Sequence, residues 1–476
     1  MMMNLNSTNL DITDPDLQEC FSDLQGGILK SHGRDVSRHV FIRFNDPDKA
    51  RTWVRSMATK VTTAIGQHES ATEWKATGKE HLFVSLLLSG DGYRALGVDP
   101  AKTPREKAFT AGMKDLAQTY NTAPRGDHKP TPNPLADDPD EWEESFRAET
   151  HALVIFAFGS SGHDDTEATA TVEEAVQQVA GALSDGGGEI ACVQQGHALR
   201  NDLGQVIEHF GFTDGVSDPM VMKTDLDRAY ANGGFEHYDP SINIGGIIVP
   251  DPGGDRDAYG SYVVYRKLQQ NLRGFADQAA AMADALGLDR ELAGALVMGR
   301  FKDGTPVGEQ NVDGWRNEFN DFNYDDDWTG TRCPLASHTR RSNPRGDTYR
   351  RFGSPVTIER SRRIVRRGIS YGTPELDPAE EWTDTGLLFM CYQANIEDQF
   401  IFIQHTWGNN QDFLEDGVGA DPVAGQCPAD QTRGPQDWPT QWGRPHSEKP
   451  FDFGDHVRMR GGEYFFAPSV SALNTI

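Results

Sequence analysis

One carboxylate, Asp214, lies between aromatic residues and glycines in the sequence EHFGFTDGVSDP, which covers residues 208–219. Flanking glycines let the backbone adopt positive φ angles or approach a ligand closely, which most residues with side chains cannot do. The rings of Phe210 and Phe212 provide apolar surroundings in which a carboxyl group is suited to proton transfer. Asp-Gly is also a very common turn dipeptide, so this segment taken alone fits a surface turn equally well.

Two segments further along the chain carry complementary groups. His338 lies in the sequence CPLASHTRRSNPR at residues 333–345, and Arg366 lies in RRIVRRGISYG at residues 362–372. A histidine, a carboxylate and an arginine on three separate segments are the protein groups that a haem peroxidase uses. A neutral imidazole binds iron on one face of the haem. On the other face, an acid–base group moves the peroxide proton and a cation stabilises the separating charge.

Taken together, these segments resemble the dye-decolorizing peroxidase family. Residues 211–215 match its Gly-x-x-Asp-Gly pattern for the distal acid, and His338 stands at the position of its proximal histidine. Arg366 opens an Arg-Arg-Gly-x-x-Tyr-Gly run, although a solvated basic surface is the alternative for this segment. Residues 24–34 and 460–469 are similar to the opening and closing segments of the family. Five matches in order, over nearly the whole chain, make the resemblance specific.

The resemblance implies a peroxidase that binds one haem b per chain and reduces hydrogen peroxide through an oxoferryl intermediate. Dyes, phenolics or other bulky aromatic compounds would donate the electrons. His338 would be the axial ligand of the haem iron, and Asp214 would act first as general base and then as general acid. Arg366 would stabilise the charge that develops as the O–O bond breaks. Leu387 and Phe389 would line the distal pocket, although strand core explains them equally well.

Four charged residues are further candidates for contacts at the site. Arg340 and Arg345 could pair with the haem propionates, and ordinary surface salt bridges are the alternative. A metal-bound histidine needs an acceptor for its second ring nitrogen, which fixes the tautomer and raises the basicity of the ligand. Glu397 and Asp398 are the candidates for this acceptor.

The resemblance also bears on how bulky donors are oxidised. Such donors cannot enter a pocket lined by Leu387 and Phe389, so electrons would come from an aromatic residue at the surface. Tyr371 is the first candidate, with Trp382 and Trp407 as alternatives.

Hydrophobic patterning predicts an α+β fold. Residues 39–44 and 261–266 are rich in β-branched and aromatic residues and predict strands. Helical spacing follows each strand, with Asp46 as the N-cap of the first helix and residues 268–275 in the second. Further strands are expected at four places: residues 81–88, 152–158, 386–393 and 399–404.

Strands that alternate with helices in two similar halves indicate a duplicated α+β unit. The family resemblance implies two ferredoxin-like domains of the dimeric α+β barrel type, with antiparallel sheets and helices packed on one side. We expect residues 1–230 to form an N-terminal domain that ends in the Asp214 motif. Residues 231–476 would then form a C-terminal, haem-binding domain.

Composition restricts the partners and the compartment. The chain has 476 residues and a formal charge of −27, which argues against nucleic acid or an anionic membrane as a partner. No apolar run approaches the roughly 20 residues that cross a bilayer, and no secretory signal is evident. Five scattered cysteines without a Cys-x-x-Cys pair fit a reducing compartment. We therefore expect a cytoplasmic protein, and the sequence allows a homo-oligomer.

Two other functions fit parts of the sequence. Glu208 and Asp214 could be the acid and base of a glycoside hydrolase, but this leaves the segments of His338 and Arg366 unexplained. A protein that stores, senses or removes iron from haem, with incidental peroxidase activity, would use the same histidine ligand.

Overall fold

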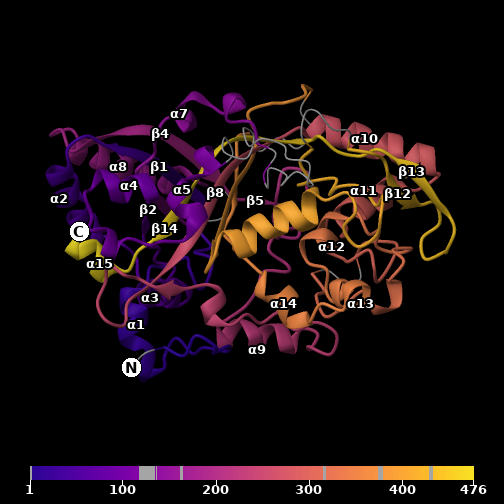
Figure 1. Ribbon diagram of the computed structural model, residues 1–476, viewed down its shortest axis with the longest axis horizontal. Helices are drawn as coiled ribbons and strands as arrows, with labels where there is room; N and C mark the ends of the chain where they lie inside the picture. Colours follow the sequence, from indigo (N-terminus) through magenta and orange to yellow (C-terminus); the bar gives the residue numbers. More distant parts are fainter. Residues whose placement is uncertain are drawn as a thin grey trace, which may run out of the picture.

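The computed structural model describes most of the chain, namely residues 3–116, 135, 137–160, 164–314, 318–373, 379–427 and 433–476. Its main feature is an antiparallel sheet with the strand order β7-β8-β14-β2-β3-β1-β4-β10-β11-β9. Strand β11 also pairs with β8, so the sheet closes on itself as a barrel. Figure 1 shows this barrel on the side of the molecule where both termini lie.

The barrel is built from two four-stranded units with the same topology. Numbered within each half, both units have the strand order 4-1-3-2 of a ferredoxin-like fold. The strands of the first half are β1 (Val36–Phe44), β2 (Phe83–Ser89), β3 (Ala152–Phe158) and β4 (Gly188–His197). Those of the second half are β8 (Tyr259–Gln270), β11 (Gly386–Gln393) and β14 (Val457–Ala467), with the second position shared by the short strands β9 (Val365–Arg366) and β10 (Ile369–Tyr371), which both pair with β11. The predicted α+β class and the duplicated ferredoxin-like units are confirmed.

Two short strand pairings, called the seams below, join the two halves. Strand β14 pairs with β2 at Phe465 opposite Ser89 and at the next residue pair, and β10 pairs with β4 at Tyr371 opposite Gly196. Because the strands of both halves belong to one sheet, the sheet itself marks no boundary between residues 230 and 231. The predicted division into two domains therefore stays a prediction.

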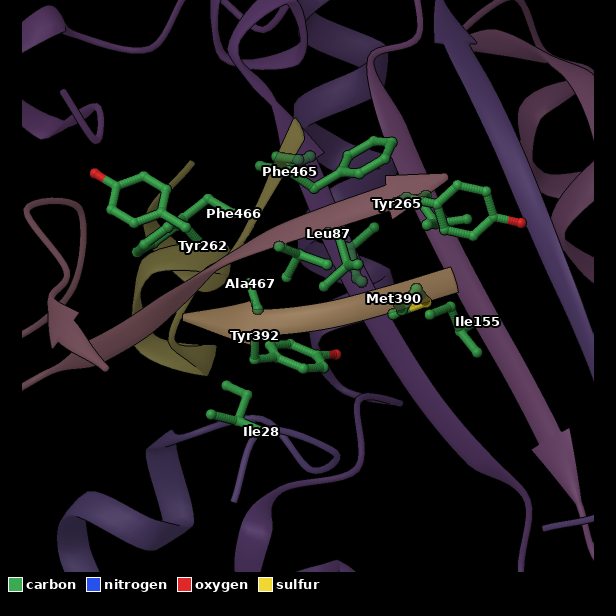
Figure 2. Packing of buried hydrophobic residues seen from close by; sticks show 14 of the residues in the cluster. Ile28, Leu87, Ile155, Tyr262, Tyr265, Met390, Tyr392, Phe465, Phe466 and Ala467 are labelled. Carbon is green, nitrogen blue, oxygen red and sulfur yellow. The ribbon is translucent and has the colours of Figure 1, made fainter. Parts of the chain in front are cut away.

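Side chains from both halves fill the interior of the barrel. Figure 2 shows Leu87 of β2 and Ile155 of β3 beside Tyr265 of β8 and Met390 of β11, and all four are buried. Alternate residues of a strand point to opposite faces. One face of β8 therefore supplies Tyr265 to this core, and the opposite face is free to line a site. Burial of each large side chain of this kind contributes roughly 1.5–3 kcal/mol.

Helices cover the outside of the barrel and extend it on one side. Asp46 caps helix α2 by accepting hydrogen bonds from the amides of Asp48 and Lys49, which confirms its predicted role. The helices α10 to α14 gather on the side away from both termini (Figure 1). Within the described residues the α-helices are α1 (Gln18–Asp23), α2 (Pro47–Ala58), α3 (Ala64–Thr77), α4 (Gly90–Ala95), α5 (Lys107–Ala111), α7 (Glu144–Arg147), α8 (Thr166–Leu183), α9 (Lys223–Ala231), α10 (Leu272–Leu286), α11 (Arg290–Met298), α12 (His338–Ser342), α13 (Asp347–Phe352), α14 (Val356–Ser361) and α15 (Val470–Thr475).

Besides β9, five short strands in the described part of the chain lie outside the eight-stranded ring. Strand β7 extends the sheet next to β8, and the other four form two separate two-stranded sheets. Their bounds are β5 (Leu199–Arg200), β6 (Val206–Ile207), β7 (Val249–Pro250), β12 (Gln436–Pro439) and β13 (Glu448–Phe451). Among the described residues, no helix has both the length and the apolar character needed to span a bilayer.

Two local predictions are wrong. The apolar run at residues 399–404 forms π-helical turns, η6 (Glu397–Ile401) and η7 (Ile403–Asn409), and not a strand. A short apolar run fits a buried strand and a buried helix equally well, so its pattern did not distinguish them. Leu268, assigned to a helix, belongs to β8, which continues to Gln270 before α10 begins at Leu272.

Candidate active site

A cavity of about 300 Å³ lies against the outer face of β8 and β11. Alternate residues of each strand line it, as the period of a strand requires: Leu268 and Gln270 from β8, and Leu387 and Phe389 from β11. Asp214, His338 and Arg366 line the same cavity. The fold thus gathers around one space the three groups that lie far apart in the sequence.

Asp214 and Arg366 form a direct ion pair at the wall of this cavity. The Arg366 guanidinium donates a hydrogen bond of 2.9 Å to Asp214 Oδ1, which also accepts from the amide of Gly215. Asp214 Oδ2 accepts no hydrogen bond within the part of the chain that the structure describes. The flanking glycines Gly211 and Gly215 have positive φ angles of 90° and 82°. A residue with a side chain would be strained in this conformation.

Further contacts fix the two partners of this ion pair. The backbone amide of Asp214 donates to the Val206 carbonyl at 3.0 Å, which ties the loop to β6. On the other partner, the backbone amide of Arg366 donates to Asp218 Oδ1 at 2.8 Å. Asp218 also accepts a hydrogen bond of 2.7 Å from Arg367. Asp218 is a part of the site that the sequence did not single out.

His338 is the first residue of α12, and a buried aspartate holds its ring. His338 Nδ1 lies 2.8 Å from Oδ2 of Asp421, whose other oxygen accepts from the amides of Val423 and Ala424. Burial alone would lower the pKa of His338, but the negative charge of Asp421 and its hydrogen bond to the ring together outweigh burial, so the pKa is raised. His338 Nε2 has no hydrogen-bond partner among the described residues and is available as a ligand atom.

The predicted partners of His338 are therefore wrong. Glu397 forms an ion pair of 3.1 Å with Lys107, and Asp398 pairs with Arg362 at 3.0 Å. The true partner, Asp421, lies 83 residues after the histidine in a loop that follows η7. No motif or spacing in the sequence connects these two residues, because only the packing of the loop against α12 brings them together.

Arg340 does not reach the cavity, so its predicted contact with a haem propionate is wrong. Its guanidinium is completely buried, donates to both carboxylate oxygens of Asp347 at 2.7 and 3.0 Å, and lies 3.3 Å from Asp327. Arg345 does line the cavity, stacked 3.8 Å from the ring centroid of Tyr238. Its role toward a propionate stays a prediction.

The aromatic residues considered for surface electron transfer are mostly buried. Tyr371 and Trp407 are each only 4% exposed, so the expectation that Tyr371 is reachable from the surface is wrong. Trp382 is half-buried, and the guanidinium of Arg458 lies 3.8 Å from its ring centroid. Burial keeps Tyr371 and Trp407 from direct contact with a bulky donor, whereas Trp382 is partly exposed with Arg458 over its ring.

The residues that line the cavity suit an anionic planar group with a metal centre. The protein carries a formal charge of −27, yet this lining holds more arginines than carboxylates. The arginines are Arg266, Arg300, Arg341, Arg345, Arg363 and Arg366, and the carboxylates are Glu208, Asp214 and Asp421. Apolar side chains from the strands, an excess of guanidinium groups and an open imidazole nitrogen fit a haem and its two propionates.

The α+β barrel, the histidine–aspartate pair and the aspartate–arginine pair together define a class of peroxidases. A family model described as Dyp-type peroxidase, C-terminal, matches residues 207–420. The multifunctional dye peroxidase DyP2 of Amycolatopsis is 34% identical, with 95% of both chains covered. The dye-decolorizing peroxidase msp1 of Mycetinis scorodonius is 29% identical over 96% of this chain and 87% of its own. The crystal structure of an Anabaena DyP-type peroxidase has a TM-score of 0.89, 38% identity and complete coverage of both chains.

The chain belongs to the DyP-type peroxidase family. It is an oxidoreductase of the dye-decolorizing peroxidase type, and membership of this family implies a haem cofactor.

Proposed function

We propose that this enzyme binds one haem b in the 300 Å³ cavity and uses hydrogen peroxide to oxidise dyes, phenolics or other aromatic donors. The observation that carries this proposal is the arrangement of two charged pairs around one cavity. His338 with Asp421 provides the ligand for iron, and Asp214 with Arg366 provides the groups that act on peroxide.

His338 would hold the iron through Nε2, which has no other partner in the described structure. Its Nδ1 is fixed by Asp421 at 2.8 Å, and the negative charge of this carboxylate makes the imidazole a stronger donor. The haem, when bound, supplies the redox chemistry, while the protein orients the reactants and sets the electrostatics.

Asp214 would move the proton. Its Oδ1 is occupied by Arg366 and Gly215, whereas Oδ2 can accept a proton from one peroxide oxygen and return it to the departing oxygen. Arg366 stabilises the negative charge on the departing oxygen and keeps Asp214 aimed at the reacting atoms. Leu387 and Phe389 line the same cavity with apolar surface and would limit the access of bulk water.

The first test is haem binding followed by peroxide-dependent dye bleaching. Reconstituted protein should show a Soret band, and Asp214→Asn or Arg366→Leu should lower the bleaching rate by about 10²–10⁴-fold. Asp398→Asn, outside the cavity, should bleach dye at the rate of the unmodified enzyme. A protein that remains colourless after haem addition, or an Asp214→Asn variant of full activity, would contradict the proposal.

A further inference from the structure

A second carboxylate, Glu208, shares the cavity with Asp214 and binds the same loop. Its Oε2 accepts hydrogen bonds of 2.9 Å from the amide of Phe210 and 2.6 Å from the side chain of Gln270. Its Oε1 accepts a hydrogen bond of 3.0 Å from the amide of Phe212. The Glu208 carboxylate thus connects the loop that carries Asp214 to strand β8: it binds two amides of the loop and the side chain of Gln270.

Other contacts fix the same loop. The Phe210 ring stacks on Phe275 of α10 at a centroid distance of 4.2 Å, with 17° between the ring planes. The amide of Glu208 donates to the Phe212 carbonyl at 3.1 Å, which closes a tight turn just before Asp214. The Glu208 carboxylate accepts the amides of two residues in this turn, so its hydrogen bonds contribute to the position of the residues that follow.

The neighbours of Glu208 include neutral, negative and positive groups. Burial raises its pKa to about 7, and the charge of Asp214 acts in the same direction. Gln270 and the packed ring of Phe275 carry no charge. His338 interacts electrostatically with Glu208, and Arg366, which lines the same cavity, is paired with Asp214.

We propose that Glu208 is a positioning residue for the peroxide reaction: it anchors the Asp214 loop to β8 through Gln270 and holds the Asp214 carboxylate in place. This inference rests on the proposed function, since it concerns the same reaction. An ionised Glu208 accepts all three N–H groups, whereas a protonated or amide side chain offers fewer acceptor sites to the same donors. Loss of its charge therefore loosens the loop.

Glu463 provides a matched control elsewhere in the fold. It is also a carboxylate that accepts two backbone amides, from Met113 at 2.7 Å and Tyr464 at 2.8 Å. Burial raises its pKa to about 7 as well. It lies on β14 and does not line the cavity, so any effect common to buried carboxylates should appear in both variants.

The test measures the rate at which the haem-loaded enzyme reacts with peroxide, across a pH range that spans the titration of Glu208. We expect Glu208→Gln to react about tenfold to hundredfold more slowly, as a small displacement of a catalytic group allows. We also expect its rate to depend less on pH around neutrality than the rate of the unmodified enzyme. Glu463→Gln should match the unmodified enzyme, and Glu208→Asp should recover part of the rate.

A measurement without haem completes the test. In the haem-free full chain, hydrogen exchange at the Phe210 and Phe212 amides should be faster in Glu208→Gln. Unchanged exchange together with an unchanged rate and pH profile would overturn the inference, and so would an equal loss of rate in Glu463→Gln.

Gln270→Met provides a second variant if Glu208→Gln fails to bind haem. It removes the link to β8 and keeps the carboxylate, so the reaction with peroxide should still slow, and an unchanged rate would overturn the inference. If the unmodified enzyme itself does not react with peroxide, the proposed function fails, which is a separate result.

Discussion

The aspartate that holds His338 determines how the histidine can act as a ligand. Asp421 is buried, and two backbone amides fix it, so it can turn neither away from the ring nor toward solvent. A charged acceptor makes an imidazole more basic and more electron-donating toward a metal. The sequence suggested the need for such an acceptor but not its position.

We expect Asp421→Asn to shift the reduction potential of the bound iron to a more positive value. The neutral amide is a weaker acceptor, so the imidazole donates less charge and stabilises the ferric state less. The reaction with peroxide should slow by about tenfold to hundredfold. Spectroelectrochemical titration of the haem-loaded protein measures the potential.

The matched control for this prediction is Glu397→Gln. Because Glu397 pairs with Lys107 and not with His338, this variant should keep the potential of the unmodified enzyme. An unchanged potential in Asp421→Asn, or an equal shift in Glu397→Gln, would contradict the assignment of the partner.

At the scale of elements, buried ion pairs hold the short helices around the cavity. Arg340 connects α12, which begins with His338, to Asp347 of α13 and to Asp327. Its guanidinium also lies 4.2 Å from the ring centroid of Tyr324. Helices of five or six residues are not stable by themselves, so such contacts maintain the orientation of His338.

Removal of this buried cation should destabilise the protein strongly. We expect Arg340→Met to lower the free energy of unfolding by about 3–5 kcal/mol, because two carboxylates lose their buried partner. Arg360, which pairs with Asp239 near the surface, should contribute no more than about 1 kcal/mol when replaced by methionine. Urea unfolding followed by tryptophan fluorescence compares the two variants, and equal effects would count against the prediction.

Strand β14 supplies a pH-dependent contribution through Glu463. Burial raises its pKa to about 7, whereas an unfolded glutamate titrates at about 4.3. The folded state therefore binds this proton more tightly. Its contribution to stability is complete below about pH 4 and is lost as the pH rises through about 7.

We expect the free energy of unfolding of the haem-free chain to decline over this interval. The decline should be smaller in Glu463→Gln, and Glu208 accounts for part of what remains because burial raises its pKa in the same way. Urea midpoints measured at several pH values give the slope. A steeper decline in the variant would show that the sign is wrong.

At the scale of the whole molecule, closure of the barrel makes the two halves depend on each other. Leu87 and Ile155 come from the first half, Tyr265 and Met390 come from the second, and all four belong to one buried cluster. Separation would expose this apolar interior and the unpaired edges of the strands at both seams. The cavity also needs both halves, because Asp214 comes from the first half and His338 from the second.

Residues 1–230 and 231–476, produced separately, should therefore fail to fold into stable monomers. When mixed during refolding, they should regain part of the structure and bind haem. Circular dichroism and gel filtration of each fragment and of the mixture test this. Two cooperatively folded fragments would support independent domains and contradict the prediction.

The local pattern of the chain was enough to predict much of the fold. Residues 152–158 and 386–393 form strands at the predicted bounds, and Asp46 caps its helix as expected. These features depend on alternation, on capping and on contacts between near neighbours, all of which the sequence displays directly. The motifs around Asp214, His338 and Arg366 likewise identified groups that the fold brings to one cavity, although their roles stay predictions.

Tertiary structure decided everything that depends on residues distant in the chain. It selected Asp421 over Glu397 as the partner of His338, buried Arg340 in ion pairs, enclosed Tyr371, and folded residues 399–404 as π-helical turns. A charged or aromatic residue has the same local pattern whether it faces a cavity, an ion-pair partner or solvent. Only the packing of loops and helices against the barrel distinguishes these cases, because it sets which groups lose water and which partners they find.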